Sequence, residues 1–332
     1  MMMDRRNQIL SAILAAQIVI AIAVFWPRTA ISGETGGPLL PDLQASDVVN
    51  LIIDDGAGMV TELARKGDGW VLGRADDYPA DGTKVTPFLE KLEKLTTDRL
   101  VTQTDASHKR LSVADDDFAR KIDVELGGGK GHEIYLGTSG GYGSTHVRAD
   151  GQSDVYLTAD LATWDANAQP SAWIDTLYFT VPQTITVAIT LENEQGTFEF
   201  EKDGDTWAMK GLADDETLDQ NSVIGLLTQV GSVRMQAPIG KTEQDSFGLD
   251  QPQAMVTVTV RDGEVEKMHT LRVGAKHTPG EESSSEAPYY VASSSQSPYF
   301  VRLPEYLGDS LSKMARADFL EVAPAPTAAG TE

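Results

Sequence analysis

The chain has 332 residues, 41% hydrophobic and 23% charged, which is the composition of folded domains and not of a disordered chain. It contains no cysteine, which excludes disulfides, thiol catalysis and thiolate metal sites. Its 50 acidic residues outnumber 27 basic ones, and the formal charge of −23 argues against nucleic-acid binding because such a surface repels phosphates. This balance favours a solvated acidic surface, with binding of cations or of a basic partner as the alternative.

An apolar run near the N-terminus extends from residue 9 to residue 26 and is interrupted by only two polar residues. It is just long enough to cross a bilayer as a helix. Arg5 and Arg6 precede it, and basic residues stay on the cytoplasmic side. We therefore expect a single-pass anchor in the cell membrane, with the N-terminus cytoplasmic and the bulk of the chain extracytoplasmic. A signal peptide cleaved near Ala30-Ile31-Ser32 is the alternative, although the run is longer than most signal cores.

The remaining chain has the pattern of two copies of one unit. GDGWVL at 67–72 and GDTWAM at 204–209 each place a polar turn before a Trp-bearing apolar run. Two alternating segments precede each run, so each copy predicts a three-stranded meander. We expect Trp70 and Trp207 to pack a helix onto the sheet, and stacking on a ligand is the alternative.

A helix is expected after each meander, because apolar residues recur at i, i+3, i+4, i+7 and i+10. The two sets are Val85, Phe88, Leu89, Leu92 and Leu95, and Val223, Leu226, Leu227, Val230 and Val233. Asp81 and Asp219 stand where helix N-caps are expected. Pro87 cannot donate a backbone hydrogen bond, which indicates that the first helix starts late, near Thr83.

Each copy continues with further strands and a short closing helix. The expected strands are 122–126 and 134–137 in the first copy, and 256–260 and 271–274 in the second. The closing helices are expected around Leu161 to Trp164 and around Pro304 to Met314. WIDTL at 173–177 then corresponds to ADFLE at 317–321.

The predicted fold class is α+β: an N-terminal transmembrane helix and then a duplicated β-meander and helix unit with mainly antiparallel sheets. The expected division is residues 1–30 for a cytoplasmic stub and anchor, 31–40 for a linker, 41–180 and 181–321 for two α+β units, and 322–332 for a disordered tail.

LLPDL at 39–43, YPAD at 78–81 and SFGLDQP at 246–252 occur in this order along the chain. Together these short motifs resemble those of the DUF4340 family of membrane-anchored bacterial and archaeal proteins. The equivalent segment of the first copy, RLSVADD at 110–116, departs from the pattern because it lacks the Gly and Pro. The resemblance implies an accessory component of ABC-type transport systems related to gliding-motility proteins, and it carries over no catalytic residues.

Three kinds of motif resemble parts of catalytic or ligand-binding sites, but their spacing or sequence context does not match those sites. GTSGG at 137–141 matches the letters of a serine-hydrolase elbow, in which Ser139 would pair with His146, but no helix follows it. GGGKG at 127–131 lacks the spacing of a phosphate loop and predicts a turn between strands. The acidic segments 114–117 and 150–154 lack a complete calcium loop.

The five histidines show no ligand spacing, although His132 and His146 flank a predicted hairpin where they could meet at a metal. We therefore predict no catalytic, cofactor-binding or metal-binding residues, no cofactor and no enzymatic activity. The predicted function is that of an accessory subunit in a membrane protein complex with an ABC permease and ATPase. The alternatives are an extracytoplasmic module that binds a polymer or small ligand and, more remotely, a serine hydrolase.

Overall fold

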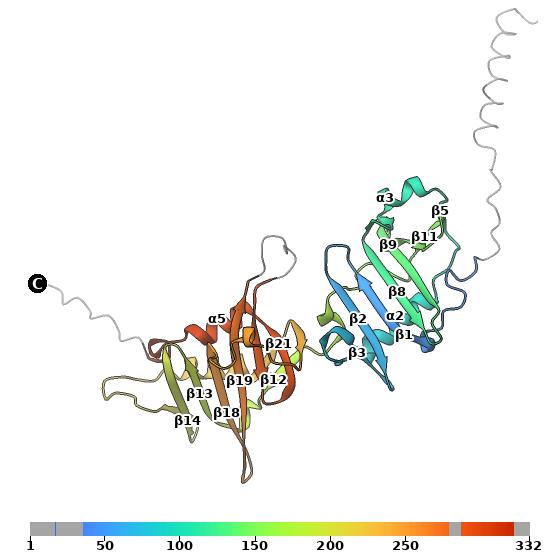
Figure 1. The fold of residues 1–332 in the computed structure, drawn as a ribbon. Helices are drawn as coiled ribbons and strands as arrows, with labels where there is room; N and C mark the ends of the chain where they lie inside the picture. Colours follow the sequence, from blue (N-terminus) through green and yellow to red (C-terminus); the bar gives the residue numbers. More distant parts are fainter. Residues whose placement is uncertain (1–16, 18–35, 279–286, 322–332) are drawn as a thin grey trace, which may run out of the picture.

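A computed structural model describes residues 36–278 and 287–321, together with the isolated Gln17. The expected anchor, residues 9–26, and the expected tail, residues 322–332, otherwise lie outside this part of the chain. No helix within the described part is long and apolar enough to span a membrane. The described residues form two large antiparallel sheets with four α-helices, so the α+β class is confirmed (Figure 1).

The first sheet has nine strands, and every neighbouring pair is antiparallel. In order across the sheet they are β4 (Tyr78–Ala80), β3 (Gly69–Leu72), β2 (Val60–Lys66), β1 (Val48–Asp54), β8 (Arg120–Leu126), β9 (Gly131–Gly141), β10 (Ser144–Ala149), β11 (Val155–Thr158) and β5 (Leu100–Thr102).

The second sheet has eight strands and is also antiparallel throughout. In order they are β15 (Thr206–Met209), β14 (Gly196–Asp203), β13 (Thr186–Asn193), β18 (Ala254–Asp262), β19 (Val265–His277), β20 (Tyr289–Ser294), β21 (Ser297–Pro304) and β17 (Ala237–Gly240). Each of these strands takes the place of a strand in the first sheet, where β4 is an additional edge. The two sheets therefore share one strand order, as the repeated meander predicted.

Alternating side chains set the register of both sheets. In the first, Leu51 lies opposite Leu63 and Val124, and all three are buried. In the second, Ile189 takes the equivalent place opposite Phe200 and Val258. A slip of one residue would expose these side chains, so burial of one face holds the pairing.

The two central helices, α2 (Gly82–Glu93) and α4 (Gln220–Gly231), lie on equivalent faces of the sheets and begin as predicted after an Asp cap. The carboxylate of Asp81 accepts from the Thr83 amide at 3.0 Å, and that of Asp219 accepts from Asn221 at 2.9 Å. Each cap residue also donates its own amide to the aromatic segment that ends its unit. The acceptors are the carbonyl oxygens of Trp173, at 2.7 Å, and Phe319, at 2.9 Å.

One of the helix predictions was wrong, whereas α2 begins at Gly82, one residue from the predicted start near Thr83. Pro87 lies inside the helix, so the Asp81 cap and not the proline sets that start. The Asp81 cap satisfies the amide of Thr83, and the apolar face of the helix is buried, which together outweigh the one bond that Pro87 lacks. Residues 161–164 form turns and not a helix, whereas the other closing helix is α5 (Glu305–Lys313).

A left-handed residue ends the same loop in both units. Ser112 follows α3 (His108–Leu111) with φ 54°, and Gly248 occupies the equivalent position with φ 63°. The left-handed turn is therefore kept at this position although RLSVADD lacks the glycine of the family pattern. Gly137 and Gly274 lie in β9 and β19 against the carbonyl oxygens of Leu111 and Phe247, and neither glycine has room for a Cβ.

The smaller elements complete the chain. Two short sheets pair β6 (Val113–Ala114) with β7 (Asp117–Phe118), and β12 (Leu177–Thr180) with β16 (Ser232–Arg234). LLPDL at 39–43 buries its three leucines in the core that α2 covers, and the amide of Leu39 donates to the carbonyl of Leu95 at 2.7 Å.

One continuous cluster of buried apolar side chains includes residues of both sheets and of the segment between them. Trp70 and Trp207 belong to it, with 5% and 6% of their surface exposed, which confirms their predicted core role. The side chain of Gln220, the first residue of α4, links this helix to strand β15: it accepts from the Trp207 amide at 2.8 Å and donates to the Trp207 carbonyl at 2.9 Å. The repeated Trp motif is therefore a building block of the fold.

Candidate functional site

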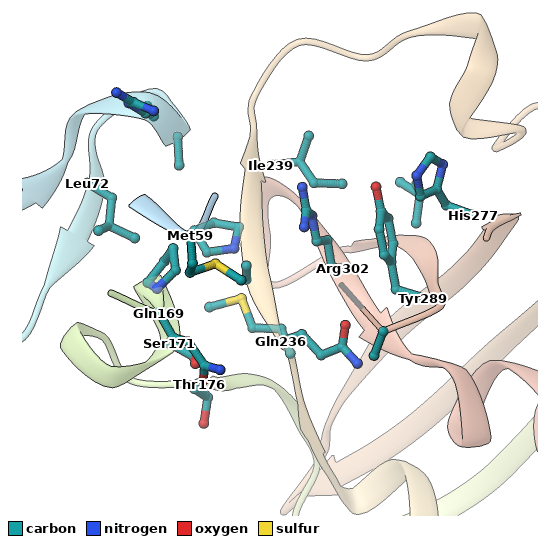
Figure 2. A pocket seen from close by; sticks show the side chains of 18 of the residues that line it. Met59, Leu72, Gln169, Ser171, Thr176, Gln236, Ile239, His277, Tyr289 and Arg302 are labelled. Atoms are coloured by element: carbon teal, nitrogen blue, oxygen red, sulfur yellow. The ribbon is translucent and has the colours of Figure 1, made fainter. Parts of the chain in front are cut away.

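A cleft of about 960 Å³ lies between the two units and is the candidate site of the described chain. One wall comes from the first sheet and the connecting segment, including Met59, Leu72 and Gln169 (Figure 2). The facing wall comes from the second unit and carries Ile239, Tyr289 and Arg302 among others. Cavities of this size between domains are a common place for ligands to bind.

A small polar joint beside the cleft holds the two units together. Asp76 and Asp77 have φ of 50° and 60°, a left-handed conformation that non-glycine residues seldom adopt. The Tyr299 hydroxyl donates to the carbonyl oxygens of both residues, at 3.4 Å and 2.9 Å. The Asp76 carboxylate accepts from the amide of Lys241 at 2.7 Å. These contacts link the turn after β3 to the second sheet beside the cleft.

Aromatic rings reinforce this joint. The Tyr78 ring packs edge-on against that of Tyr299 with centroids 4.7 Å apart, and the ammonium of Lys241 lies 4.6 Å from the Tyr299 centroid. On the other side, the Tyr178 hydroxyl donates to the Tyr299 carbonyl at 2.7 Å. Tyr299 is therefore the residue through which the two units make most of their polar contact here.

The lining of the cleft is partly apolar. Met59 and Leu72 come from the first unit, and Met235 and Phe247 come from the second. Leu72, Met235 and Phe247 are buried by the fold, whereas Met59 is half-buried and lies toward the cleft (Figure 2). Methionine side chains adapt their shape to different partners, so this part of the wall suits aliphatic groups of varied outline.

A stack of three side chains lines the wall of the second unit. The rings of His277 and Tyr289 are 4.8 Å apart, and the guanidinium of Arg302 lies 4.7 Å from the Tyr289 centroid (Figure 2). The residues come from β19, β20 and β21, which are neighbours in the sheet. Cross-strand pairing thus brings one cation and two aromatic rings into a row that faces the cleft.

The charged residues of the lining have the opposite balance to the chain as a whole. Four are basic, namely Arg74, Arg234, Lys276 and Arg302, and only Glu62 is acidic. Lys276 is held by Glu305 and Asp309 of α5, whose hydrogen bonds raise its pKa, so its charge is already balanced.

Two arginines remain largely open to solvent at the cleft. The side chains of Arg74 and Arg234 are each 64% exposed. Arg74 pairs with Glu62 at 3.1 Å, and Arg234 donates to the Thr176 hydroxyl at 2.9 Å and lies 4.0 Å from the Asp175 carboxylate. Exposed ion pairs of this kind are weak, so both guanidinium groups retain donors for an anionic ligand.

The structure does not assemble the residues of the hydrolase alternative. Ser139 lies within β9 and its hydroxyl donates to the Ser144 carbonyl at 3.3 Å. His146 is buried in β10, and its Nδ1 lies 2.7 Å from the Thr138 carbonyl. Neither group hydrogen-bonds the other, and strand β10, not a helix, follows the loop. The nucleophile elbow is therefore not formed.

The remaining motif residues have structural partners. GGGKG at 127–131 makes the turn from β8 to β9, as predicted. Asp115 binds Arg148, and Asp116 binds Lys109 at 2.6 Å. His132 lies toward the opposite end of β9 from His146, so the two do not meet. In the described part of the chain, no group of three or more His, Asp and Glu side chains is placed to hold a metal ion.

A cluster of titratable side chains, Lys121, Asp123 and Glu133, lies on the first sheet away from the cleft. Asp123 and Glu133 face each other across β8 and β9, and the ammonium of Lys121 lies 3.7 Å and 2.7 Å from their carboxylates. Partial burial, together with the neighbouring Glu133, raises the pKa of Asp123 to about 6. Burial also acts on Glu133, but hydrogen bonds from Lys121 and Tyr135 outweigh it and lower the pKa. Every member is satisfied within the sheet, which indicates a structural network.

Sequence reasoning missed the cleft because its residues are scattered from Gly58 to Arg302 and share no motif. The available signal was the family segment YPAD at 78–81, whose Tyr78 contributes to the joint. A second signal was the pair Asp76-Asp77 directly before it, since consecutive acidic residues favour a turn.

Comparisons with known proteins give one match. The family model described as a domain of unknown function (DUF4340) matches residues 70–252, which is more than half of the chain. The matched range begins in β3 and ends before β18, so it includes both central helices and the joint residues Asp76, Asp77 and Lys241, but not Tyr299. No curated protein and no solved structure matches the chain.

Proposed function

The chain belongs to the DUF4340 family, whose function is unknown, and we propose that it is a non-catalytic interaction protein anchored in a membrane. Residues 9–26 are the proposed anchor, with the bulk of the chain extracytoplasmic. The proposed partners are the permease and ATPase of an ABC-type transport system, as the resemblance of its motifs implied. Residues 41–180 and 181–321 are the two proposed units, which we interpret as copies of one ancestral unit.

The observation that carries this proposal is the cleft between the units. It is large enough for a segment of another chain, and both units contribute to its walls. Its only carboxylate, Glu62, is held by Arg74, and its only histidine, His277, is stacked on Tyr289 and has no nucleophile or carboxylate of the described lining as a hydrogen-bond partner. A surface with many donors and apolar groups but no such constellation supports recognition better than catalysis.

Crosslinking in the native membrane tests the proposed partners. The full-length chain is crosslinked, extracted and identified together with whatever it captures. Recovery of a permease and an ATPase is expected. Recovery of no membrane protein, under conditions in which a known membrane complex is captured, would overturn the accessory role.

The anchor is tested separately by membrane extraction and by sequencing the mature N-terminus. An uncleaved anchor keeps the chain in the membrane at high pH, and the N-terminal residues 1–8 remain attached. A mature chain that begins near Ser32 and is released from membranes would establish the signal-peptide alternative.

A second candidate function is a binding module for a polymer or small ligand, and the stack of His277, Tyr289 and Arg302 favours it. Aromatic rings beside a cation are suited to sugars and to anionic rings. Thermal-shift measurements across glycans, peptides and metal ions test this function. A stabilising ligand whose effect disappears in Tyr289→Ala would support it, and no shift with any of them would count against it.

A further inference from the structure

We propose that the cleft binds an extended acidic segment of a partner protein, one that combines carboxylate with aliphatic side chains. This inference rests on the proposed interaction function and specifies the partner's chemistry. It is carried by three properties of the lining that occur together: exposed arginines, an adaptable apolar wall, and contributions from both units.

Charge complementarity is the first step. The chain as a whole has 27 basic and 50 acidic residues, whereas the cleft lining has four basic residues and one acidic residue, although Lys276 is already paired with Glu305 and Asp309. Arg74 projects from the first unit and Arg234 from the second, and both side chains are 64% exposed. A carboxylate-bearing segment that approaches elsewhere meets a repulsive surface, so the field directs it to this cleft.

The geometry of the two arginines favours an elongated ligand. Arg74 follows β3 of the first unit and Arg234 ends β16 of the second, so a ligand that contacts both arginines reaches from one unit to the other. The lining also presents neutral donors and acceptors, including Gln236, Ser171 and Thr176 (Figure 2). Amides and hydroxyls of this kind suit the backbone groups of a peptide.

The apolar part of the lining separates a peptide from an acidic glycan. Met59 and Ile239 are half-buried and lie toward the cleft (Figure 2), while Leu72 and Met235 also line it but are buried in the core. Aliphatic and thioether groups match the side chains of Leu, Ile or Val, whereas glycans are bound mainly by rings and planar polar groups. The combination of arginines with this wall therefore fits a peptide that has both acidic and aliphatic residues.

The test measures binding of labelled peptides to the full-length chain in lipid nanodiscs by fluorescence anisotropy. The probes are peptides of alternating Leu and Glu, Leu and Gln, and Leu and Lys, together with an oligogalacturonate as the acidic glycan. We expect the Leu-Glu peptide to bind most tightly, and its affinity to fall with added salt because the arginines remain partly exposed to solvent.

Charge reversal locates the binding site. The double variant Arg74→Glu, Arg234→Glu should weaken the Leu-Glu peptide by at least about tenfold, because each lost contact is a charge-assisted hydrogen bond. The control Arg99→Glu, Arg110→Glu makes the same change in net charge at two exposed residues of the first unit. It should leave the affinity within about twofold, and melting curves of both variants check their folding.

Several results would overturn the inference. They are equal losses in the two double variants, preference for the oligogalacturonate or for the Leu-Gln peptide, and no binding of any probe. The proposed function is judged independently by the membrane crosslinking experiment. If partners are captured equally by the wild type and by the Arg74→Glu, Arg234→Glu variant, this inference fails and the accessory role stands. If the Leu-Glu peptide binds in the cleft but no membrane partner is captured, the accessory role fails and the inference stands.

Discussion

Asp123 and Glu133 illustrate how two residues on one sheet can titrate in opposite directions. They face each other across β8 and β9, and Lys121 lies closer to Glu133 than to Asp123. Lys121 and the Tyr135 hydroxyl therefore stabilise the charge of Glu133, while Asp123 keeps its proton to a pKa of about 6. Partial burial and the repulsion between the two neighbouring carboxylates therefore raise the pKa of Asp123 and not that of Glu133.

The variant Asp123→Asn tests this arrangement. The folded-state pKa of Asp123 lies above its ordinary value of 3.8, so the folded protein holds the proton more tightly than the unfolded chain does. The stability that this bound proton contributes is fully present below the ordinary pKa of 3.8 and is lost as the pH rises through about 6. We expect Asp123→Asn to raise the free energy of unfolding at about pH 8 by roughly 1 kcal/mol, discounted for partial exposure, and to have little effect at about pH 4.

Urea unfolding at the two pH values provides the measurement for Asp123→Asn. Glu125→Gln, an exposed position on the same strand, is the control for loss of one negative charge. A stabilisation by Asp123→Asn that is equal at both pH values would contradict the assigned pKa.

Two glycines in the equivalent strands β9 and β19 provide a second prediction at this scale. A Cβ at Gly137 or Gly274 would overlap the carbonyl oxygen of Leu111 or Phe247, which the backbone cannot easily move. We expect either substitution by Ala to destabilise the fold by roughly 3 kcal/mol. In Gly225→Ala the new methyl group meets nothing within 4 Å in α4, so this control should stabilise by about 0.5–1 kcal/mol. Thermal unfolding distinguishes the two directions, and tolerance of Gly137→Ala would contradict the close approach.

Helices α2 and α4 show, at the scale of elements, which local signals determine a structure. Their apolar faces and Asp caps are local patterns, and both helices begin where those patterns predict. The helix predicted at 161–164 does not form, because Leu161 and Ala162 are buried against the core without completing a helical face. Short segments follow tertiary contacts more than their own periodicity.

Removal of the Asp cap should destabilise α2 and α4 to a similar extent. In Asp81→Ala and Asp219→Ala the first turn loses its acceptor, and we expect each to lower the melting temperature by about 2–4 °C. Hydrogen bonds from Thr83 and Ser222 lower the pKa of Asp81 and Asp219 respectively, so the stability that the caps provide is present above the ordinary carboxyl value. It is lost as the pH falls through the lowered folded-state pKa. Asn at either position, which keeps the acceptor, should restore most of the melting temperature, and equal loss with Asn would contradict a capping role.

For the molecule as a whole, the joint at Tyr299 decides how the two units face each other. Tyr299→Phe keeps the ring but removes the hydroxyl that donates to Asp76 and Asp77. The loss of roughly 1 kcal/mol of contact should broaden the distribution of distances between the units without unfolding either. Tyr306→Phe, at a hydroxyl exposed on α5, is the control.

Because the chain has no cysteine, spin labels placed on Lys130→Cys and Asp205→Cys report only the distance between the two sheets. Pulsed electron–electron double resonance on this pair of labels should show a wider distance distribution in Tyr299→Phe than in Tyr306→Phe. An unchanged distribution would mean that ring packing alone holds the joint.

By itself, the sequence determined the α+β class, the repeated meanders, the two central helices with their caps and the membership of the DUF4340 family. These follow from periodicity, turn residues and short motifs, which act over a few neighbouring residues. Only the tertiary structure decided that Ser112 adopts the backbone of Gly248, that Ser139 and His146 do not pair, and that a cationic cleft lies between the units. Those outcomes depend on contacts between residues far apart in the chain, and no local pattern encodes which distant side chains converge.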